Sequence, residues 1–151
     1  MKSQFVISNF VVPDGYDAEG QYTTAYDLAI IAKECLDNPC LAEIFAKEKS
    51  YERWAGGREV TYRNTNKLLD SNSPFHYPEV IGIKTGTSSL SGASLVSAAV
   101  INGKTYLSVV MGASTEDGRF QDSIMIYDAI KALPQKEQQT YDSTPLILCF
   151  S

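Results

Sequence analysis

The dipeptide Asn102-Gly103 restricts the fold of this chain more than any other feature of its sequence. It separates two runs of apolar and β-branched residues, 93–101 and 105–113. Asn-Gly between such runs is the strongest short signal for a tight β-hairpin, because both residues tolerate positive φ. A third run, 80–85, has the same character. The sequence therefore predicts an antiparallel sheet of at least these three strands.

Helical patterns lie on both sides of these strands. Thr24, three residues before Asp27, resembles a capping box, and apolar residues recur at helical spacing until Asp37-Asn38-Pro39. We expect a second, shorter helix at about 39–47. We expect a third helix on an apolar stripe of Phe120, Ile124, Tyr127, Ile130 and Leu133.

Other segments have an extended or irregular character. Gly56-Gly57 predicts a second hairpin between 50–54 and 59–63. Residues 5–12 suggest a strand or extended arm before a loop, 64–77 a loop, and 134–144 a linker. The resulting fold class is α+β, with an antiparallel sheet covered by helices.

Composition excludes several classes of function. The 151 residues carry 13 Lys and Arg against 18 Asp and Glu, a net charge of −5 without a basic patch, so nucleic acid is not an expected partner. No apolar run reaches the roughly 18 residues of a membrane-spanning helix, and no signal peptide is recognisable. With a single histidine, His76, and no Cys-x-x-Cys pair, we expect no metal and no cofactor. We interpret Cys35, Cys40 and Cys149 as small buried apolar residues.

The segment Lys84-Thr85-Gly86-Thr87 is the best candidate for chemistry. A lysine ammonium and a threonine hydroxyl at a strand end suit an anionic substrate, and glycine lets a substrate backbone come close. The next amide, on Thr87, suits a developing oxyanion. Strand alternation places Lys84 and Gly86 on one face and Thr85 on the other. The triplet alone is also compatible with a solvated lysine before a glycine turn.

Several segments in the same order resemble the D-alanyl-D-alanine carboxypeptidases, the low-molecular-mass penicillin-binding serine peptidases. The resemblance covers residues 5–133 and implies a partial β-lactamase/transpeptidase-like fold, with 1–133 as the C-terminal portion of a catalytic domain and 134–151 as a linker or tail. The matching segments are Phe10–Tyr16, Tyr22–Ala29, Asn64–Leu69, Gly82–Gly86, Ser91-Gly92, Val109–Ala113 and Gly118-Arg119.

The resemblance implies a role for each matched site residue. Lys84 and Thr85 would bind the terminal carboxylate of a D-alanyl-D-alanine stem peptide or of a β-lactam, and Gly86 would allow the peptide to dock as a strand. The Thr87 amide would be half of the oxyanion hole. Arg119 matches the arginine that reinforces the carboxylate site, although a helix residue in a surface ion pair is an equal alternative on sequence alone.

Two motifs of the family are absent from the 151 residues. No lysine has a serine three residues before it, so the Ser-x-x-Lys nucleophile is missing, and no serine has asparagine two residues later. Tyr62-Arg63-Asn64 fits a Tyr-x-Asn variant, but it lies inside the Asn64–Leu69 match. Since both motifs lie upstream of the matched region in the family, we expect a truncated product, a start assigned at an internal methionine, or a subfragment, inactive alone.

Two other interpretations stay open. The chain could be a non-catalytic binding module that self-associates through surface left uncovered, forming a homo-oligomer or pairing with a missing N-terminal fragment. It could also be a relative of the β-lactamases, although 22–29 and 64–69 favour the carboxypeptidases. The resemblance implies a cell-envelope location, which the absence of an export signal leaves open for this chain.

Overall fold

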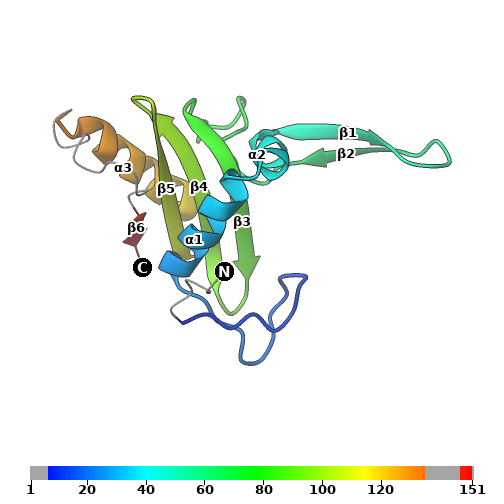
Figure 1. Cartoon of the computed structure of the whole chain (residues 1–151), viewed down its shortest axis with the longest axis horizontal. Helices are drawn as coiled ribbons and strands as arrows, with labels where there is room; N and C mark the ends of the chain where they lie inside the picture. Colours follow the sequence, from blue (N-terminus) through cyan, green and yellow to red (C-terminus); the bar gives the residue numbers. More distant parts are fainter. Residues whose placement is uncertain (1–6, 135–146, 151) are drawn as a thin grey trace.

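A computed structural model describes residues 7–134 and the backbone of 147–150. Its elements form a mixed α+β arrangement around one four-stranded sheet (Figure 1). In chain order they are α1 (Ala25–Leu36), α2 (Pro39–Ala46), β1 (Lys49–Arg53), β2 (Glu59–Arg63), β3 (Val80–Ser88), β4 (Gly92–Ile101), β5 (Lys104–Ala113), α3 (Gly118–Ala132) and β6 (Ile147–Phe150).

The sheet follows the order β3-β4-β5-β6. The first three strands are antiparallel, as predicted, and Asn102 and Gly103 between β4 and β5 have φ values of 52° and 77°. These positive angles are those of a two-residue hairpin turn whose twist matches the flanking strands. β6 adds a parallel strand beside β5, in the apolar run 146–150, for which the sequence left open a pairing segment or a tail.

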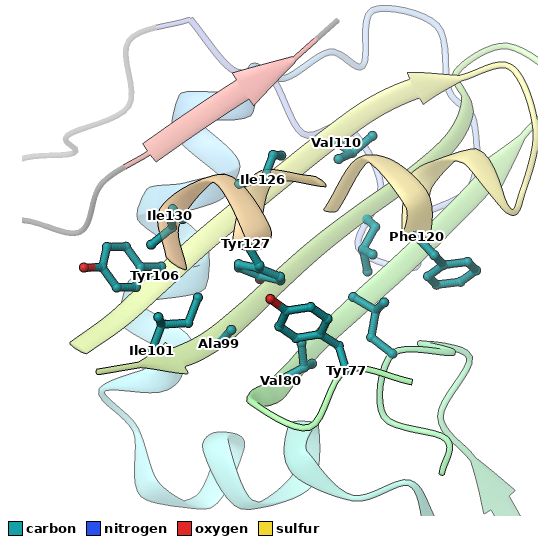
Figure 2. Close-up of a cluster of buried hydrophobic side chains, with 12 residues drawn as sticks. Tyr77, Val80, Ala99, Ile101, Tyr106, Val110, Phe120, Ile126, Tyr127 and Ile130 are labelled. Atoms are coloured by element: carbon teal, nitrogen blue, oxygen red, sulfur yellow. The ribbon is translucent and has the colours of Figure 1, made fainter. Parts of the chain in front are cut away.

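The two faces of the sheet carry separate apolar cores. α3 packs on one face, where Phe120 and Tyr127 belong to one buried cluster with Leu95 and Ala99 of the sheet. Figure 2 shows Phe120, Tyr127 and Ala99 in this cluster. α1 and α2 lie on the opposite face, where Ala29 belongs to a cluster with Ala98, Leu107 and Val109 of the sheet. The sheet is therefore the middle layer between helices.

The predicted helices begin at residues that cap them. The Thr24 hydroxyl accepts a hydrogen bond from the Asp27 amide at 3.0 Å, which gives the first turn of α1 a partner. The Asn38 side chain caps α2 in the same way, with Pro39 as its first residue. In α3 the buried face includes Ile126, whereas the predicted stripe residue Leu133 is 37% exposed.

The strands β1 and β2 form a separate hairpin that projects from the body (Figure 1). They pair from Lys49 opposite Arg63 to Arg53 opposite Glu59, as the Gly56-Gly57 signal predicts. Near the start of the described chain, Asn9 and Tyr22 form an isolated antiparallel bridge in place of the expected arm. Residues 5–6 of that arm and 135–144 of the predicted linker lie outside the described part of the chain.

Two expectations from composition have clear outcomes. Among the described residues, no helix is long and apolar enough to cross a membrane. The expectation of buried cysteines is wrong for Cys40, which is exposed on α2, and Cys35 is only partly buried. The reason is that α2 packs on the buried cluster of its face of the sheet through Phe45, and none of its residues is fully buried within the described structure, so Cys40 stays outside that core. The side chain of Cys149 lies outside the described residues.

Candidate functional site

The residues Lys84 to Thr87 lie on β3, which is an edge strand of the sheet within the described part of the chain. Lys84, Gly86 and Thr87 are exposed, whereas Thr85 is only 7% exposed. This is the alternation that the sequence predicts for Lys84, Thr85 and Gly86. The register with β4 places Lys84 opposite Val96 and Thr85 opposite Leu95, so Lys84 lies on the α2 side and Thr85 on the α3 side.

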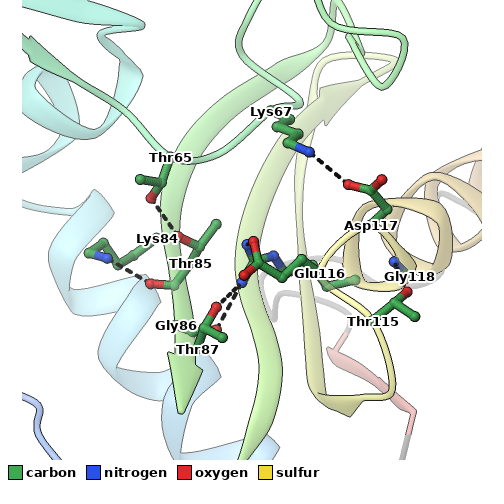
Figure 3. Close-up of polar contacts among 11 residues, drawn as sticks. Thr65, Lys67, Lys84, Thr85, Gly86, Thr87, Thr115, Glu116, Asp117 and Gly118 are labelled. Atoms are coloured by element: carbon green, nitrogen blue, oxygen red, sulfur yellow. Dashed lines mark hydrogen bonds and ion pairs between the residues drawn. The ribbon is translucent and has the colours of Figure 1, made fainter. Parts of the chain in front are cut away.

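The ammonium group of Lys84 stays close to its own strand. Nζ donates a hydrogen bond to the carbonyl oxygen of Thr85 at 2.6 Å (Figure 3). The side chain also lines a groove between β3, α2 and the β1–β2 hairpin. A cation at the rim of a groove is well placed to meet an anionic group.

The hydroxyl of Thr85 has a partner from a distant loop. It forms a hydrogen bond with the hydroxyl of Thr65, in the segment that follows β2 (Figure 3). A hydroxyl has one proton to donate and two lone pairs to accept. If Thr65 donates in this pair, the Thr85 proton stays available for another acceptor.

Two asparagines shape the loop that carries Thr65. The side-chain Nδ2 of Asn64 donates to the Phe45 carbonyl at 3.2 Å, and its side-chain oxygen accepts from the backbone amide of Asn66 at 3.0 Å. Asn66 is fully buried, and its side-chain oxygen accepts from the Leu68 amide at 3.1 Å. Side-chain bonds of this kind replace a backbone turn. These hydrogen bonds therefore hold the Asn64–Leu69 loop against α2, and the bond between Thr65 and Thr85 holds it against β3.

Arg119 approaches the end of β3 from the first turn of α3. Its Nη1 atom donates to the Gly86 carbonyl at 2.9 Å and to the Thr87 hydroxyl at 2.7 Å (Figure 3). The residue is only 4% exposed, and its guanidinium carbon lies 5.0 Å from the centre of the Phe120 ring. An ion pair to Glu116 at 3.4 Å also exists, but the arginine is buried rather than part of an exposed surface pair.

The start of α3 is held by one local contact and is joined to the same region by an ion pair. The Thr115 hydroxyl accepts from the Gly118 amide at 3.0 Å. Lys67 forms an ion pair with Asp117 at 2.7 Å, which connects the Asn64–Leu69 loop to the helix start (Figure 3). Two segments far apart in sequence, the Asn64–Leu69 loop and the start of α3, thus converge on Lys84–Thr87 of β3.

The structure brings together all the residues for which the sequence suggested a role. Lys84, Thr85, Gly86 and Thr87 follow one another on β3, and Arg119 contacts two of them. The sequence analysis missed Thr65 as the partner of Thr85, although Thr65 lies inside a segment that it singled out. His76 is exposed in a loop, and the described residues include no group of histidine, cysteine and acidic side chains that could hold a metal ion.

Comparisons with known proteins show the family to which the sequence is related. The sequence profile of the D-alanyl-D-alanine carboxypeptidase family matches residues 5–115. D-alanyl-D-alanine carboxypeptidase DacF of Bacillus subtilis is 33% identical over 112 residues, which are 74% of this chain and 28% of DacF. D-alanyl-D-alanine carboxypeptidase DacA of Escherichia coli K12 is 37% identical over 117 residues, 77% of this chain and 27% of DacA.

Solved structures show the same fold. The Streptomyces K15 DD-transpeptidase superposes with a TM-score of 0.74 at 28% identity, covering 83% of this chain and 48% of that protein. Penicillin-binding protein D2 of Listeria monocytogenes, in its cefotaxime-bound form, gives a TM-score of 0.65 at 26% identity, covering 80% and 47%. The chain spans little more than a quarter of the curated relatives and about half of these structures. It belongs to the D-alanyl-D-alanine carboxypeptidase family.

Proposed function

We propose that this chain forms the carboxylate-binding and oxyanion half of a serine-type D-alanyl-D-alanine carboxypeptidase site. In this proposal Lys84 and Thr85 bind the terminal carboxylate of a peptidoglycan stem peptide or of a β-lactam. Gly86 leaves room for the peptide backbone, and the Thr87 amide faces the developing oxyanion. Residues 1–133 form this half of the catalytic domain, and β6, within the 134–151 segment, adds a strand to its sheet.

The observation that carries the proposal is the pair of cations at one strand end. Lys84 is exposed beside the groove, and Arg119 is bonded to the Gly86 carbonyl and to the Thr87 hydroxyl. Arg119 acts as a positioning residue, because its hydrogen bonds fix the strand end from which Lys84 and the Thr87 amide extend. Its buried positive charge also favours an anion bound near Thr87.

The nucleophile must come from outside these 151 residues, since they contain no Ser-x-x-Lys. The assembled enzyme would form an ester between its serine and the carbonyl of the penultimate D-alanine, release the terminal D-alanine, and hydrolyse the ester with water. This chain alone is therefore inactive, and its own affinity for the peptide is weak. The assembled enzyme acts on the cell wall, outside the cytoplasmic membrane.

Fusion to the missing part of a relative tests this function. The portion of Bacillus subtilis DacF that precedes the matched segment would be joined to residue 1 of this chain. Release of D-alanine from diacetyl-L-lysyl-D-alanyl-D-alanine would be measured for the fusion, for the chain alone, and for a fusion with Lys84→Gln. We expect release only from the first fusion. Equal release from the Lys84→Gln fusion would contradict the assigned site.

A second candidate function is a non-catalytic module that associates with itself. It is favoured by the outer edge of β3, which has no strand partner among the described residues and could pair with another copy. Sedimentation velocity over a hundredfold range of concentration separates the two candidates. A monomer at all concentrations counts against self-association, and a concentration-dependent dimer supports it.

A further inference from the structure

The β1–β2 hairpin concentrates residue types that are scarce in the rest of the chain. Its 15 residues, 49–63, include the single tryptophan, Trp54, and three of the four arginines, Arg53, Arg58 and Arg63. Arginine presents a planar fork of donors that matches phosphate and carboxylate oxygens. Tryptophan combines an apolar body with one polar N–H group. A segment of this composition suits a partner surface that is both anionic and partly apolar.

The tip of the hairpin stands clear of the body (Figure 1). All residues of 51–59 are exposed, with Tyr51 at 70% and Trp54 at 58%. A Cβ atom added at Gly56 or Gly57 would meet no other atom within 4 Å, so no described residue covers the turn. Residues 53–58 also take no part in lining the groove beside β3. The tip is therefore a free surface within the described part of the chain.

The turn holds its tryptophan between two arginines. The backbone amide of Trp54 donates to the Arg58 carbonyl at 2.8 Å, and its carbonyl accepts from the Gly57 amide at 3.0 Å. Arg53 directly precedes Trp54 and lies opposite Glu59 in the register of the two strands. One aromatic residue thus occupies the tip with an arginine on each side. Because hydrogen bonds already order this turn, binding through it costs little conformational entropy.

The cations of the hairpin lack carboxylate partners. Lys49, Arg53, Arg58 and Arg63 form no ion pair with the described residues, whereas five cations elsewhere do: Lys33, Lys47, Lys67, Arg119 and Lys131. Lys49 also lies directly opposite Arg63 in the ladder. Like charges directly opposite each other destabilise a pair of strands. An anionic surface beside the hairpin would relieve this repulsion.

Charge also distinguishes the hairpin from the body of the chain. Residues 49–63 carry four cations against the two carboxylates of Glu52 and Glu59, whereas the other 136 residues carry nine cations against 16 carboxylates. An anionic surface therefore attracts the hairpin and repels the body. Exposed charges interact over about 8 Å at physiological salt. Only an element that projects from the body can make such a contact without the repulsion.

A bilayer with anionic headgroups matches these features together. Its phosphates accept paired hydrogen bonds from guanidinium groups. Tryptophan and tyrosine gather at the headgroup level of membranes, where one end of the side chain is apolar and the other is wet. A flat surface can meet the tip of the hairpin while the acidic body stays away from it. A dissolved chain of phosphates would satisfy the arginines but offers no apolar layer to Trp54.

We propose that the tip of the β1–β2 hairpin docks on the surface of an anionic phospholipid bilayer. Trp54 enters the headgroup layer, and Arg53 and Arg58 bind lipid phosphates on either side of it. The contact is peripheral and reversible, because each cation near such a surface contributes only about fivefold in affinity. It does not depend on the proposed peptidase function, since no residue of the tip belongs to the candidate site.

The single tryptophan makes the docking directly observable in the full chain. Its fluorescence is followed during titration with mixed phosphatidylcholine–phosphatidylglycerol vesicles and with phosphatidylcholine vesicles alone. We expect a blue shift and protection from acrylamide with the mixed vesicles only. Bromine atoms on the lipid chains should quench the shifted emission, and added salt should weaken the binding. The shift then places Trp54 itself at the bilayer, because no other tryptophan contributes.

Charge variants test the role of the two arginines. Arg53→Gln and Arg58→Gln should each weaken binding to the mixed vesicles by about fivefold. Lys33→Gln is the matched control, because it removes one exposed positive charge from α1 and should leave the affinity unchanged. Trp54→Ala, followed by cosedimentation with the vesicles, should also weaken binding at least fivefold. Circular dichroism of each variant checks that it folds like the unaltered chain.

Several results would overturn the proposal. These are no binding to the mixed vesicles, equal binding to the neutral vesicles, or an equal loss of affinity in Arg53→Gln and Lys33→Gln. Polyphosphate and single-stranded DNA are titrated at the same phosphate concentration. A larger fluorescence change with either of them than with the mixed vesicles would assign the hairpin to a linear polyanion and reject the bilayer. None of these results bears on D-alanine release by the DacF fusion, so the two proposals fail separately.

Discussion

The Nη1 atom of Arg119 lies 2.9 Å from the carbonyl oxygen of Gly86, across 33 residues of sequence. This bond joins the first turn of α3 to the end of β3, and the same atom bonds the Thr87 hydroxyl at 2.7 Å. Arg119 itself is only 4% exposed, whereas Gly86 and Thr87 are exposed, so the contact is partly buried. The position of the β3 segment that carries the candidate site therefore depends on α3, a helix that follows the β4–β5 hairpin in the sequence.

Removal of the Arg119 side chain should destabilise the chain. Hydrogen bonds to charged groups contribute about 1.5–3 kcal/mol each, so we expect Arg119→Ala to lower the free energy of unfolding by about 2–4 kcal/mol. Arg119→Lys should recover only part of this loss, because one ammonium cannot reproduce the planar guanidinium. Urea unfolding measures both. Arg58→Ala, at the exposed hairpin turn, should change stability by less than about 0.5 kcal/mol, and an equal effect there would contradict the assignment.

The hydroxyl pair of Thr65 and Thr85 predicts an asymmetric result. Thr65→Val leaves the buried Thr85 hydroxyl without its partner, which should cost about 1–2 kcal/mol. Thr85→Val leaves the hydroxyl of the exposed Thr65, which water can satisfy, so we expect a loss below about 1 kcal/mol. The double variant should be less destabilised than the two single losses together. Strict additivity in urea unfolding of the four proteins would show that the pair contributes nothing.

Burial of Tyr127 predicts a loss of stability at high pH. Desolvation raises the pKa of its phenol above the ordinary value of 10.0. Because the pKa of Tyr127 is higher in the folded chain than in the unfolded chain, the unfolded chain loses the phenol proton first as the pH rises. The contribution of Tyr127 to the free energy of unfolding is therefore fully present below pH 10 and falls as the pH rises from 10 toward the pKa of the folded state. Tyr127→Phe should remove this part of the alkaline loss and change stability at pH 7 by less than about 1.5 kcal/mol. Urea unfolding at pH 7, 9 and 10.5 measures the slope; an unchanged slope in Tyr127→Phe refutes the prediction.

Lys84 should affect ligand binding without affecting stability. Its side chain is exposed and bonds only its neighbouring carbonyl among the contacts described, so Lys84→Gln should leave the urea midpoint unchanged. In the DacF fusion, loss of a charge-assisted hydrogen bond of about 1.5–3 kcal/mol should weaken binding of acetyl-D-alanyl-D-alanine by about tenfold or more. Titration followed by NMR gives the affinity. Lys104→Gln, at the far end of the sheet, serves as control.

Local features of the fold are predictable from the sequence because they depend on neighbouring residues. The caps at Thr24 and Asn38 and the turn at Asn102-Gly103 involve residues within three positions of one another. The three antiparallel strands follow from the same local patterns. The strand of the candidate site is also recognisable from the sequence, because Lys84–Thr87 are consecutive residues that match a motif of the family.

Long-range contacts are not predictable in this way. Nothing near Arg119 in the sequence indicates that it bonds Gly86 and Thr87 in addition to the nearby Glu116. The pairing of Thr65 with Thr85 depends on how the Asn64–Leu69 loop crosses β3. The parallel pairing of β6 with β5 and the exposure of α2 depend on which surfaces other segments cover. These features come from tertiary packing, which local patterns do not encode.

Intact-mass measurement after incubation with a penicillin tests the central claim most directly. The chain would be treated alone and then together with the upstream portion of DacF. The account predicts no adduct on this chain in either case, and one covalent adduct on the DacF portion when both are present. An adduct on this chain alone would show that it carries its own nucleophile. No adduct on a complex shown to form would contradict the assignment of Lys84–Thr87 as half of the site.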